Sequence, residues 1–76
     1  GAVMVNLVGD ENHEGDVYYQ NIDKIMNFKG VTPHIYGKAQ TRPFRKMGHV
    51  TIVDEDINIA RQTAEQVKGL IRVISR

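Results

Sequence analysis

Hydrophobic and polar positions divide this chain into strand-like and helix-like segments. Segment 3–8, VMVNLV, is a short apolar run that stops at Gly9, which is typical of a buried strand. Segment 31–37, VTPHIYG, predicts a second strand, with Pro33 at its start or on a sheet edge because proline cannot donate to a ladder. Segment 47–54, MGHVTIVD, alternates and predicts a third strand.

The clearest helical pattern spans residues 57–74. Its apolar side chains recur every three or four positions and form one stripe: Ile57, Ala60, Ala64, Val67, Ile71 and Ile74. Acids at 54–56 precede it, and Arg72 and Arg76 fall at its end, as the helix dipole favours. Gly69 inside a helix costs about 1 kcal/mol relative to alanine, which suggests a close contact with the sheet.

A shorter helix is predicted over residues 18–28, with Gly30 as its stop. Its apolar positions at helical spacing are Tyr18, Ile22, Ile25 and Phe28. Segments 9–17 and 38–46 are polar or proline-containing loops. Without repeats or linkers, the chain is predicted to be one α+β unit, a small antiparallel sheet packed against a C-terminal helix.

Length and composition limit what such a unit does. The 76 residues form a single domain, 1–76, that is 41% hydrophobic and 25% charged. A core this thin leaves little room for a self-contained active-site cleft. There is no cysteine, and no apolar run reaches the ~20 residues of a membrane span, so we expect a cytoplasmic protein.

Charge is unevenly distributed although the formal net charge is only +1. Residues 1–23 contain five acids and no lysine or arginine, and residues 24–53 contain six basic residues and no acid. Residues 54–76 contain four of each. The middle of the chain should therefore carry a positive potential that favours an anionic partner, although a simply solvated basic face gives the same pattern.

Four of these cations lie in one loop between two predicted strands: Lys38, Arg42, Arg45 and Lys46. A hairpin-like connection would bring them together. Arginine offers a planar fork of donors and lysine a compact charge, a combination that suits a phosphate group. Gly37 and Gly48 flank the loop and permit close approach of a ligand. A solvated surface loop remains the alternative.

The other chemistry-bearing residues form no recognisable site. His13, His34 and His49 match no zinc spacing, and His49 is predicted to face either the core or the basic loop. No nucleophile, base and stabiliser come together, and there is no phosphate-binding glycine motif.

Two binding functions remain as alternatives. Tyr36 and Phe44 could stack on bases, but nucleic-acid binding usually requires a higher net charge. The pair Lys46–Met47 is faintly similar to a carrier-domain lysine, without the required turn around it.

Three motifs together resemble one family. NLVG at 6–9, HIYGK at 34–38 and RPFRKMGHVTIV at 42–53 are similar, in this order, to the C-terminal domain of an ATP-grasp enzyme of purine biosynthesis. That enzyme makes 5-(carboxyamino)imidazole ribonucleotide and is also called the ATPase subunit of phosphoribosylaminoimidazole carboxylase. The resemblance covers nearly the whole chain. It departs at Phe44, where the family commonly has glycine, so either the loop bends differently here or that position never needed a positive φ.

The resemblance implies a reaction that the whole enzyme performs. Bicarbonate is joined to 5-aminoimidazole ribonucleotide through carboxyphosphate, with ATP and Mg²⁺. The family holds the nucleotide and the metal ligands in its N-terminal and ATP-grasp domains. The chain is therefore expected to be a C-terminal fragment that binds no cofactor alone and does not turn over. The full-length enzyme is expected to be a homodimer that needs neither nucleic acid nor membrane.

The resemblance also assigns roles within the basic loop. By motif position, Lys38 and Arg45 hold the 5′-phosphate of the ribonucleotide at a domain boundary. Possible supporting residues are Arg42, Lys46, Tyr36 and His49. The implied fold is a small, β-rich barrel-sandwich hybrid with a C-terminal helix and more, shorter strands than periodicity alone predicts. The alternatives are a structural or dimerisation module and a small anion- or nucleic-acid-binding domain.

Overall fold

Six strands and two helices make up the chain, and the computed structural model describes all of residues 1–76. The elements are β1 (Ala2–Val8), β2 (Gly15–Gln20), α1 (Ile22–Ile25), β3 (Val31–Ile35), β4 (Gln40–Thr41), β5 (Lys46–Val53), α2 (Ile57–Leu70) and β6 (Arg72–Ser75). They form two three-stranded sheets, ordered β1-β5-β3 and β4-β2-β6, in which every strand pair is antiparallel. The strand-rich α+β class and the long helix near the C-terminus are confirmed.

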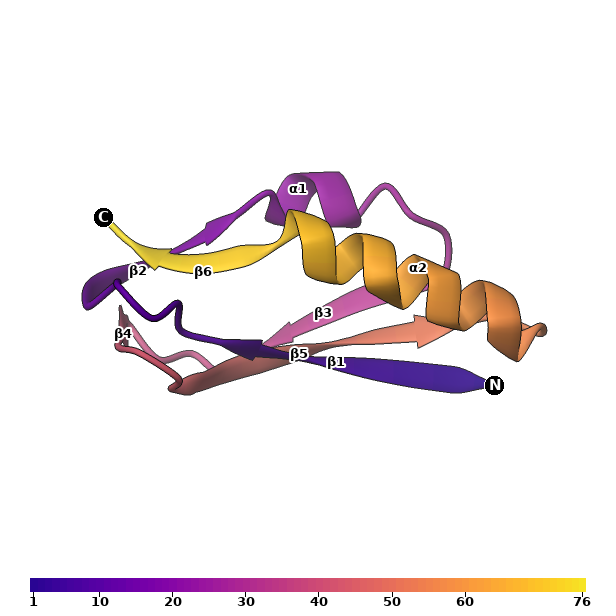
Figure 1. Cartoon of the computed structure of the whole chain (residues 1–76), viewed down its shortest axis with the longest axis horizontal. Helices are drawn as coiled ribbons and strands as arrows, with labels where there is room; N and C mark the ends of the chain where they lie inside the picture. Colours follow the sequence, from indigo (N-terminus) through magenta and orange to yellow (C-terminus); the bar gives the residue numbers. More distant parts are fainter.

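The two sheets and α2 form two layers (Figure 1). The sheet β1-β5-β3 is the lower layer, α2 covers one half of it, and β6, β2 and α1 lie over the other half. The molecule is elongated, about 38 × 19 × 18 Å, and its termini lie at opposite ends. No helix is both long and apolar enough to cross a membrane.

The core lies between α2 and one face of the lower sheet. On the central strand β5, Val50 and Ile52 are buried, whereas His49 and Thr51 are only half-buried on the opposite face, as the alternation predicted. Eleven apolar residues form the buried cluster: Val5, Leu7, Ile25, Met47, Val50, Ile52, Ala60, Ala64, Val67, Ile71 and Val73. The helix contributes two alanines, whose small size lets its backbone approach the sheet.

The start of α2 was predicted correctly from the acidic cluster. The carboxylate of Asp56, the N-cap, accepts a hydrogen bond from the backbone N–H of Asn58 at 2.9 Å. Asp54 in turn accepts one from the backbone N–H of Asp56 at 2.9 Å. These contacts satisfy donors that the first helical turn would otherwise leave free.

The predicted end of this helix is wrong. Helix α2 stops at Leu70, and Ile71 takes an extended conformation (φ −81°, ψ 135°) that leads into β6. Ile71 and Val73 are buried and the intervening Arg72 is exposed, so the last apolar positions follow a strand period rather than a helical one. Strand β2 provides the ladder that makes an extended segment favourable here.

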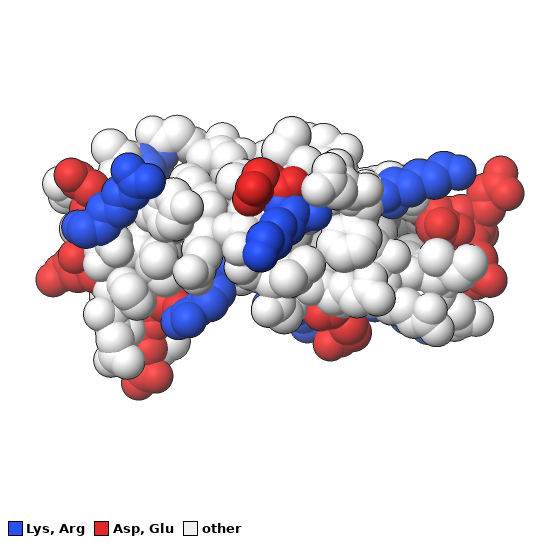
Figure 2. Space-filling view, turned by 90° about the horizontal axis from the view of Figure 1, so that it is seen from above, with Lys and Arg blue, Asp and Glu red and all other residues white.

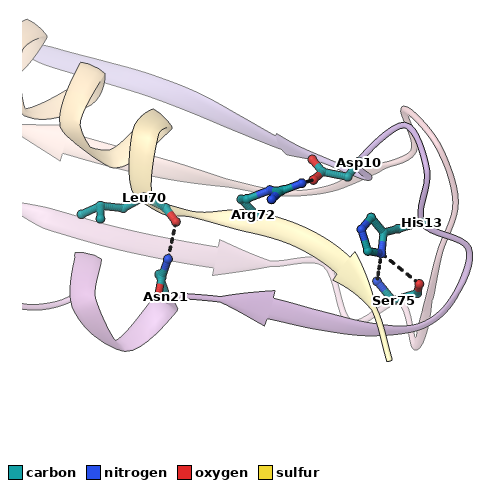
Figure 3. Close-up of polar contacts among 6 residues, drawn as sticks. All are labelled: Asp10, His13, Asn21, Leu70, Arg72 and Ser75. Atoms are coloured by element: carbon teal, nitrogen blue, oxygen red, sulfur yellow. Dashed lines mark hydrogen bonds and ion pairs between the residues drawn. The ribbon is translucent and has the colours of Figure 1, made fainter.

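Three polar contacts hold β6 against the segment that precedes α1 (Figure 3). Arg72 forms an ion pair with Asp10, and the backbone N–H of Ser75 donates to Nδ1 of His13 at 3.1 Å. Just before β6, the carbonyl of Leu70 accepts a hydrogen bond from the side chain of Asn21 at 2.8 Å. None of these long-range pairs follows from local periodicity.

The helix predicted over 18–28 is largely wrong. Residues 15–20 form β2, and α1 has only four residues, Ile22–Ile25. Asn21, at φ +67°, separates the two. Of the predicted apolar stripe, Ile25 is fully buried and Ile22 and Phe28 pack against the core. Tyr18 lies outside it, beneath the guanidinium of Arg76 at 4.4 Å.

The close contact predicted for Gly69 is absent. A Cβ added at Gly69 would meet no heavy atom within 4 Å, whereas one added at Gly9 would lie 2.0 Å from the carbonyl oxygen of Arg42. Close packing therefore requires a glycine at position 9, where β1 ends beside the basic loop, and not at position 69.

Candidate anion-binding loop

The basic loop connects two neighbouring antiparallel strands, β3 and β5. Ile35 pairs with Gly48 at the end of the ladder, and the backbone N–H of Tyr36 donates to the carbonyl of Met47 at 3.1 Å. Within the loop, β4 pairs with β2, with Gln40 opposite Asp16. The loop is thus fastened to both sheets, which limits how far its side chains can move.

The second half of the loop contains a tight turn at residues 42–45. The backbone N–H of Arg45 donates to the carbonyl of Arg42 at 3.1 Å, with Pro43 and Phe44 between them and Phe44 at φ +64°. A proline followed by a residue at positive φ is the pattern of a type II turn. The expectation that this position never needed a positive φ is therefore wrong, because Phe44 takes one.

Gly9 fastens this turn to β1. Its carbonyl accepts from the N–H of Phe44 and its own N–H donates to the carbonyl of Arg45, both at 2.8 Å. The resulting bonds on both sides of Gly9 hold Phe44 in its left-handed conformation. The sequence showed Gly9 only as the end of a strand.

Lys38 is half-buried and tethered within the loop. Its Nζ donates to the carbonyl of Lys46 at 2.8 Å and lies 6.0 Å from the centre of the Tyr36 ring. An ammonium has three N–H donors, so two remain for a ligand.

Arg45 is also half-buried and tethered. Its Nη1 donates to the carbonyl of Gln40 at 3.2 Å. This is one of five guanidinium donors, so four remain. Gln40, whose carbonyl performs this role, was not singled out from the sequence, because backbone acceptors have no residue signature.

Arg42 and Lys46 are exposed, and their side chains make no hydrogen bond or ion pair. The ion pairs of the chain are Lys68–Glu65 and Arg72–Asp10. All four loop cations therefore lack a carboxylate partner, and their charge remains available to an anion. By contrast, the face seen in Figure 2 carries cations and acids next to one another.

Tyr36 and His49 lie at the base of the loop. The Tyr36 hydroxyl is 2.9 Å from Nδ1 of His49, a hydrogen-bond distance. The His34 and His49 rings stack with centroids 4.6 Å apart and planes inclined by 22°. His49 faces the loop side of the sheet rather than the core. No three His, Cys, Asp or Glu side chains gather as a metal site would require.

The loop is an open surface rather than a cleft. The main hollow of about 390 Å³ lies elsewhere, along β1 and the start of β6, and none of the four loop cations lines it. An anion bound by the loop would therefore be covered on one side only. A second surface is needed to enclose it.

Comparison with known proteins agrees with the motifs. The family described as "Phosphoribosylaminoimidazole carboxylase C-terminal domain" matches residues 2–63. The chain belongs to this family. The basic loop lies within the matched region, and so does the clamp at Gly9, by which we mean its two hydrogen bonds to Phe44 and Arg45.

Similar proteins carry this domain as a small part of a longer chain. An N5-carboxyaminoimidazole ribonucleotide synthase from Synechocystis is 46% identical over 63 residues, which cover 83% of this chain and 16% of that protein. A formate-dependent phosphoribosylglycinamide formyltransferase from Syntrophotalea carbinolica is 34% identical over 96% of this chain and 18% of the relative. The crystal structure of N5-carboxyaminoimidazole ribonucleotide synthetase from Thermotoga maritima superimposes with a TM-score of 0.95 at 41% identity, over 99% of this chain and 21% of that one. The chain thus spans about a fifth or less of their lengths.

Proposed function

We propose that this chain is the C-terminal domain of an ATP-dependent enzyme that carboxylates 5-aminoimidazole ribonucleotide. Its contribution is to bind the 5′-phosphate of the ribonucleotide through Lys38 and Arg45 and to help close the active site. The observation that carries the proposal is the pair of half-buried cations, each tethered to a loop carbonyl and each without a carboxylate partner.

Tethering matters because it reduces the entropy lost on binding. A free lysine or arginine must give up most of its rotamer freedom to hold a phosphate, at a cost of up to about 2 kcal/mol. Lys38 and Arg45 have given up part of this freedom already, since each donates one hydrogen bond within the loop. Their remaining donors can then form charge-assisted bonds with phosphate oxygens.

The names of the relatives support the choice of phosphate. Carboxyaminoimidazole ribonucleotide and phosphoribosylglycinamide differ in the group attached to the sugar, but both contain a phosphoribosyl unit. A domain common to both proteins would recognise the part that their substrates share. An exposed cationic loop suits the phosphate better than either of the groups attached to the sugar.

The remaining parts of the reaction belong to other domains. The chain has no cluster of acidic or histidine ligands for Mg²⁺, so its residues do not fit a metal site. We expect the nucleotide and the metal to be held by the rest of the enzyme. Closing this loop over the ribonucleotide from a second domain would exclude water, which protects a reactive acyl phosphate from hydrolysis.

Steady-state kinetics of the full-length enzyme carrying Lys38→Ala or Arg45→Ala test the proposal. Loss of a charge-assisted hydrogen bond costs about 1.5–3 kcal/mol. KM for the ribonucleotide should therefore rise about 10- to 150-fold, and KM for ATP should stay near wild type.

Lys29→Ala is the matched control, because Lys29 is an exposed cation outside the loop and makes no ion pair. It removes the same charge and should leave both KM values unchanged. If the two loop variants also leave the ribonucleotide KM near wild type, the phosphate assignment is wrong and the loop is a solvated surface.

A further inference from the structure

We propose that Tyr36 and His49, with His34 behind them, form a positioning unit that holds Lys38 for the phosphate. This inference rests on the proposed function. The unit is a chain of contacts across the open face of the lower sheet. The His34 ring stacks on the His49 ring, and His49 is hydrogen-bonded to the Tyr36 hydroxyl. The Lys38 ammonium lies over the Tyr36 ring.

The backbone before Lys38 explains why such a unit is needed. Gly37, between Tyr36 and Lys38, has φ +78°, and a Cβ there would meet no atom within 4 Å. The residue is therefore unconfined by packing, and glycine has the largest backbone freedom of any residue. The position of Lys38 must be set by contacts on either side of Gly37. Those on the N-terminal side involve Tyr36.

The pairing of β3 with β5 places His49, the hydrogen-bond partner of the Tyr36 hydroxyl. His34 and His49 are directly opposed in the β3–β5 ladder, so their rings are brought face to face by the register. The stack restricts the orientation of the His49 ring, and Nδ1 then lies 2.9 Å from the Tyr36 hydroxyl. The phenol ring is held by this bond at one end and by its backbone bond to Met47 at the other.

The ring in turn limits where the lysine can lie. Lys38 Nζ is 6.0 Å from the ring centre, within reach of a cation–π attraction, while it donates to the Lys46 carbonyl. A movement of the phenol ring would change the path that the lysine side chain takes to that carbonyl. Tyr36 thus acts through Lys38, and it is a positioning residue rather than a ligand.

A double-mutant cycle in the full-length enzyme tests this inference. Tyr36→Phe removes the hydroxyl and keeps the ring. It should raise KM for the ribonucleotide about 2- to 12-fold, the equivalent of one neutral hydrogen bond, with kcat and KM for ATP unchanged. In the Lys38→Ala background the same substitution should change KM by less than about twofold, because the residue through which it acts is gone.

Variants of His49 provide the rescue test. His49→Asn keeps a polar atom near the position of Nδ1 and should retain most of the wild-type KM. His49→Phe keeps a ring against His34 but offers no hydrogen bond, and should match Tyr36→Phe. Thr51→Val is the control, since Thr51 lies on the same face of β5 as His49 but pairs with Thr32, farther from the loop.

Each outcome separates the two hypotheses. If Lys38→Ala leaves KM unchanged, the proposed function itself fails. If Lys38→Ala raises KM but Tyr36→Phe does not, the positioning role is refuted. It is also refuted if Tyr36→Phe raises KM by the same factor in the Lys38→Ala background as in the wild type. A fall in kcat and a rise in both KM values, together with a lower denaturation midpoint, would show that the unit only supports the fold and would also overturn the inference.

Discussion

Substitution of Gly9 by alanine should damage the junction between β1 and the basic loop. The added Cβ would lie 2.0 Å from the carbonyl oxygen of Arg42 and 2.5 Å from Oγ1 of Thr41. The first of these is backbone and cannot move aside by a rotamer change. The turn at 42–45 must therefore shift away from β1, and that shift stretches the two 2.8 Å hydrogen bonds between Gly9 and the turn.

The expected loss follows from these contacts. Overpacking of this kind costs about 1–3 kcal/mol. Each weakened backbone hydrogen bond adds up to about 0.5–1.5 kcal/mol. We therefore expect Gly9→Ala to lower the free energy of unfolding by about 2–6 kcal/mol. For a chain of this length the total stability is only about 4–11 kcal/mol.

Urea denaturation followed by circular dichroism measures this change. Gly69→Ala is the matched control: it adds the same methyl group inside α2, where a Cβ meets no atom within 4 Å. Alanine favours a helix by up to about 1 kcal/mol over glycine, so this variant should be more stable than wild type. A free energy of unfolding for Gly9→Ala within about 0.5 kcal/mol of the wild-type value would refute the packing explanation.

Two further predictions concern the turn and the phenol of β2. Phe44→Gly relieves a left-handed strain of about 1–2 kcal/mol and costs about 0.4–1 kcal/mol in added freedom of the unfolded chain. It should therefore unfold at equal or higher urea concentration than wild type, while Phe44→Ala, which keeps the strain and removes a 71% exposed side chain, should gain nothing. Burial raises the pKa of the Tyr19 phenol above its ordinary value of 10.0, and its hydroxyl has no hydrogen-bond partner. Because the folded state holds this proton more tightly than the unfolded state, stability should fall as the pH rises above about 10, and less steeply in Tyr19→Phe, as denaturation between about pH 9 and 11 would show. Equal slopes in the two proteins would contradict the assignment.

How far the fold could be predicted depended on whether local signals agreed with tertiary pairing. The start of α2 was predictable because Asp56 caps the helix within its own first turn. Its end was not, since Ile71 and Ile74 continue the helical spacing while Ile71 and Val73 fit the spacing of a strand. The choice between them was made by β2, which lies more than fifty residues away in sequence. The helix expected over 18–28 failed for the same reason, because β2 is itself paired with β6.

The candidate site shows a similar division. Lys38 and Arg45 could be named from the motifs, since charged residues in a loop are visible in the sequence. What fixes them could not be, because Lys38 and Arg45 are tethered by the carbonyls of Lys46 and Gln40, and any residue supplies a carbonyl. The stack of His34 on His49 was equally hidden, since it requires the register of β3 on β5.

The clamp at Gly9 ties the stability of the fold to the geometry of the loop. Gly9 ends the strand whose Val5 and Leu7 are part of the buried core, and its next contacts are the backbones of Phe44 and Arg45. The hydrogen bonds of Gly9 therefore also fix the backbone position from which the Arg45 side chain extends. Lys38 makes a different set of contacts: its Nζ donates to the carbonyl of Lys46 on β5 and lies 6.0 Å from the ring of Tyr36, whose hydroxyl is 2.9 Å from Nδ1 of His49. The two cations are thus held by two different sets of contacts, one from the end of β1 at Gly9 and one from β5 and the segment after β3. If Lys38 and Arg45 bind the phosphate as proposed, a variant that loosens one set of contacts should weaken phosphate binding by one cation and leave the other cation in place.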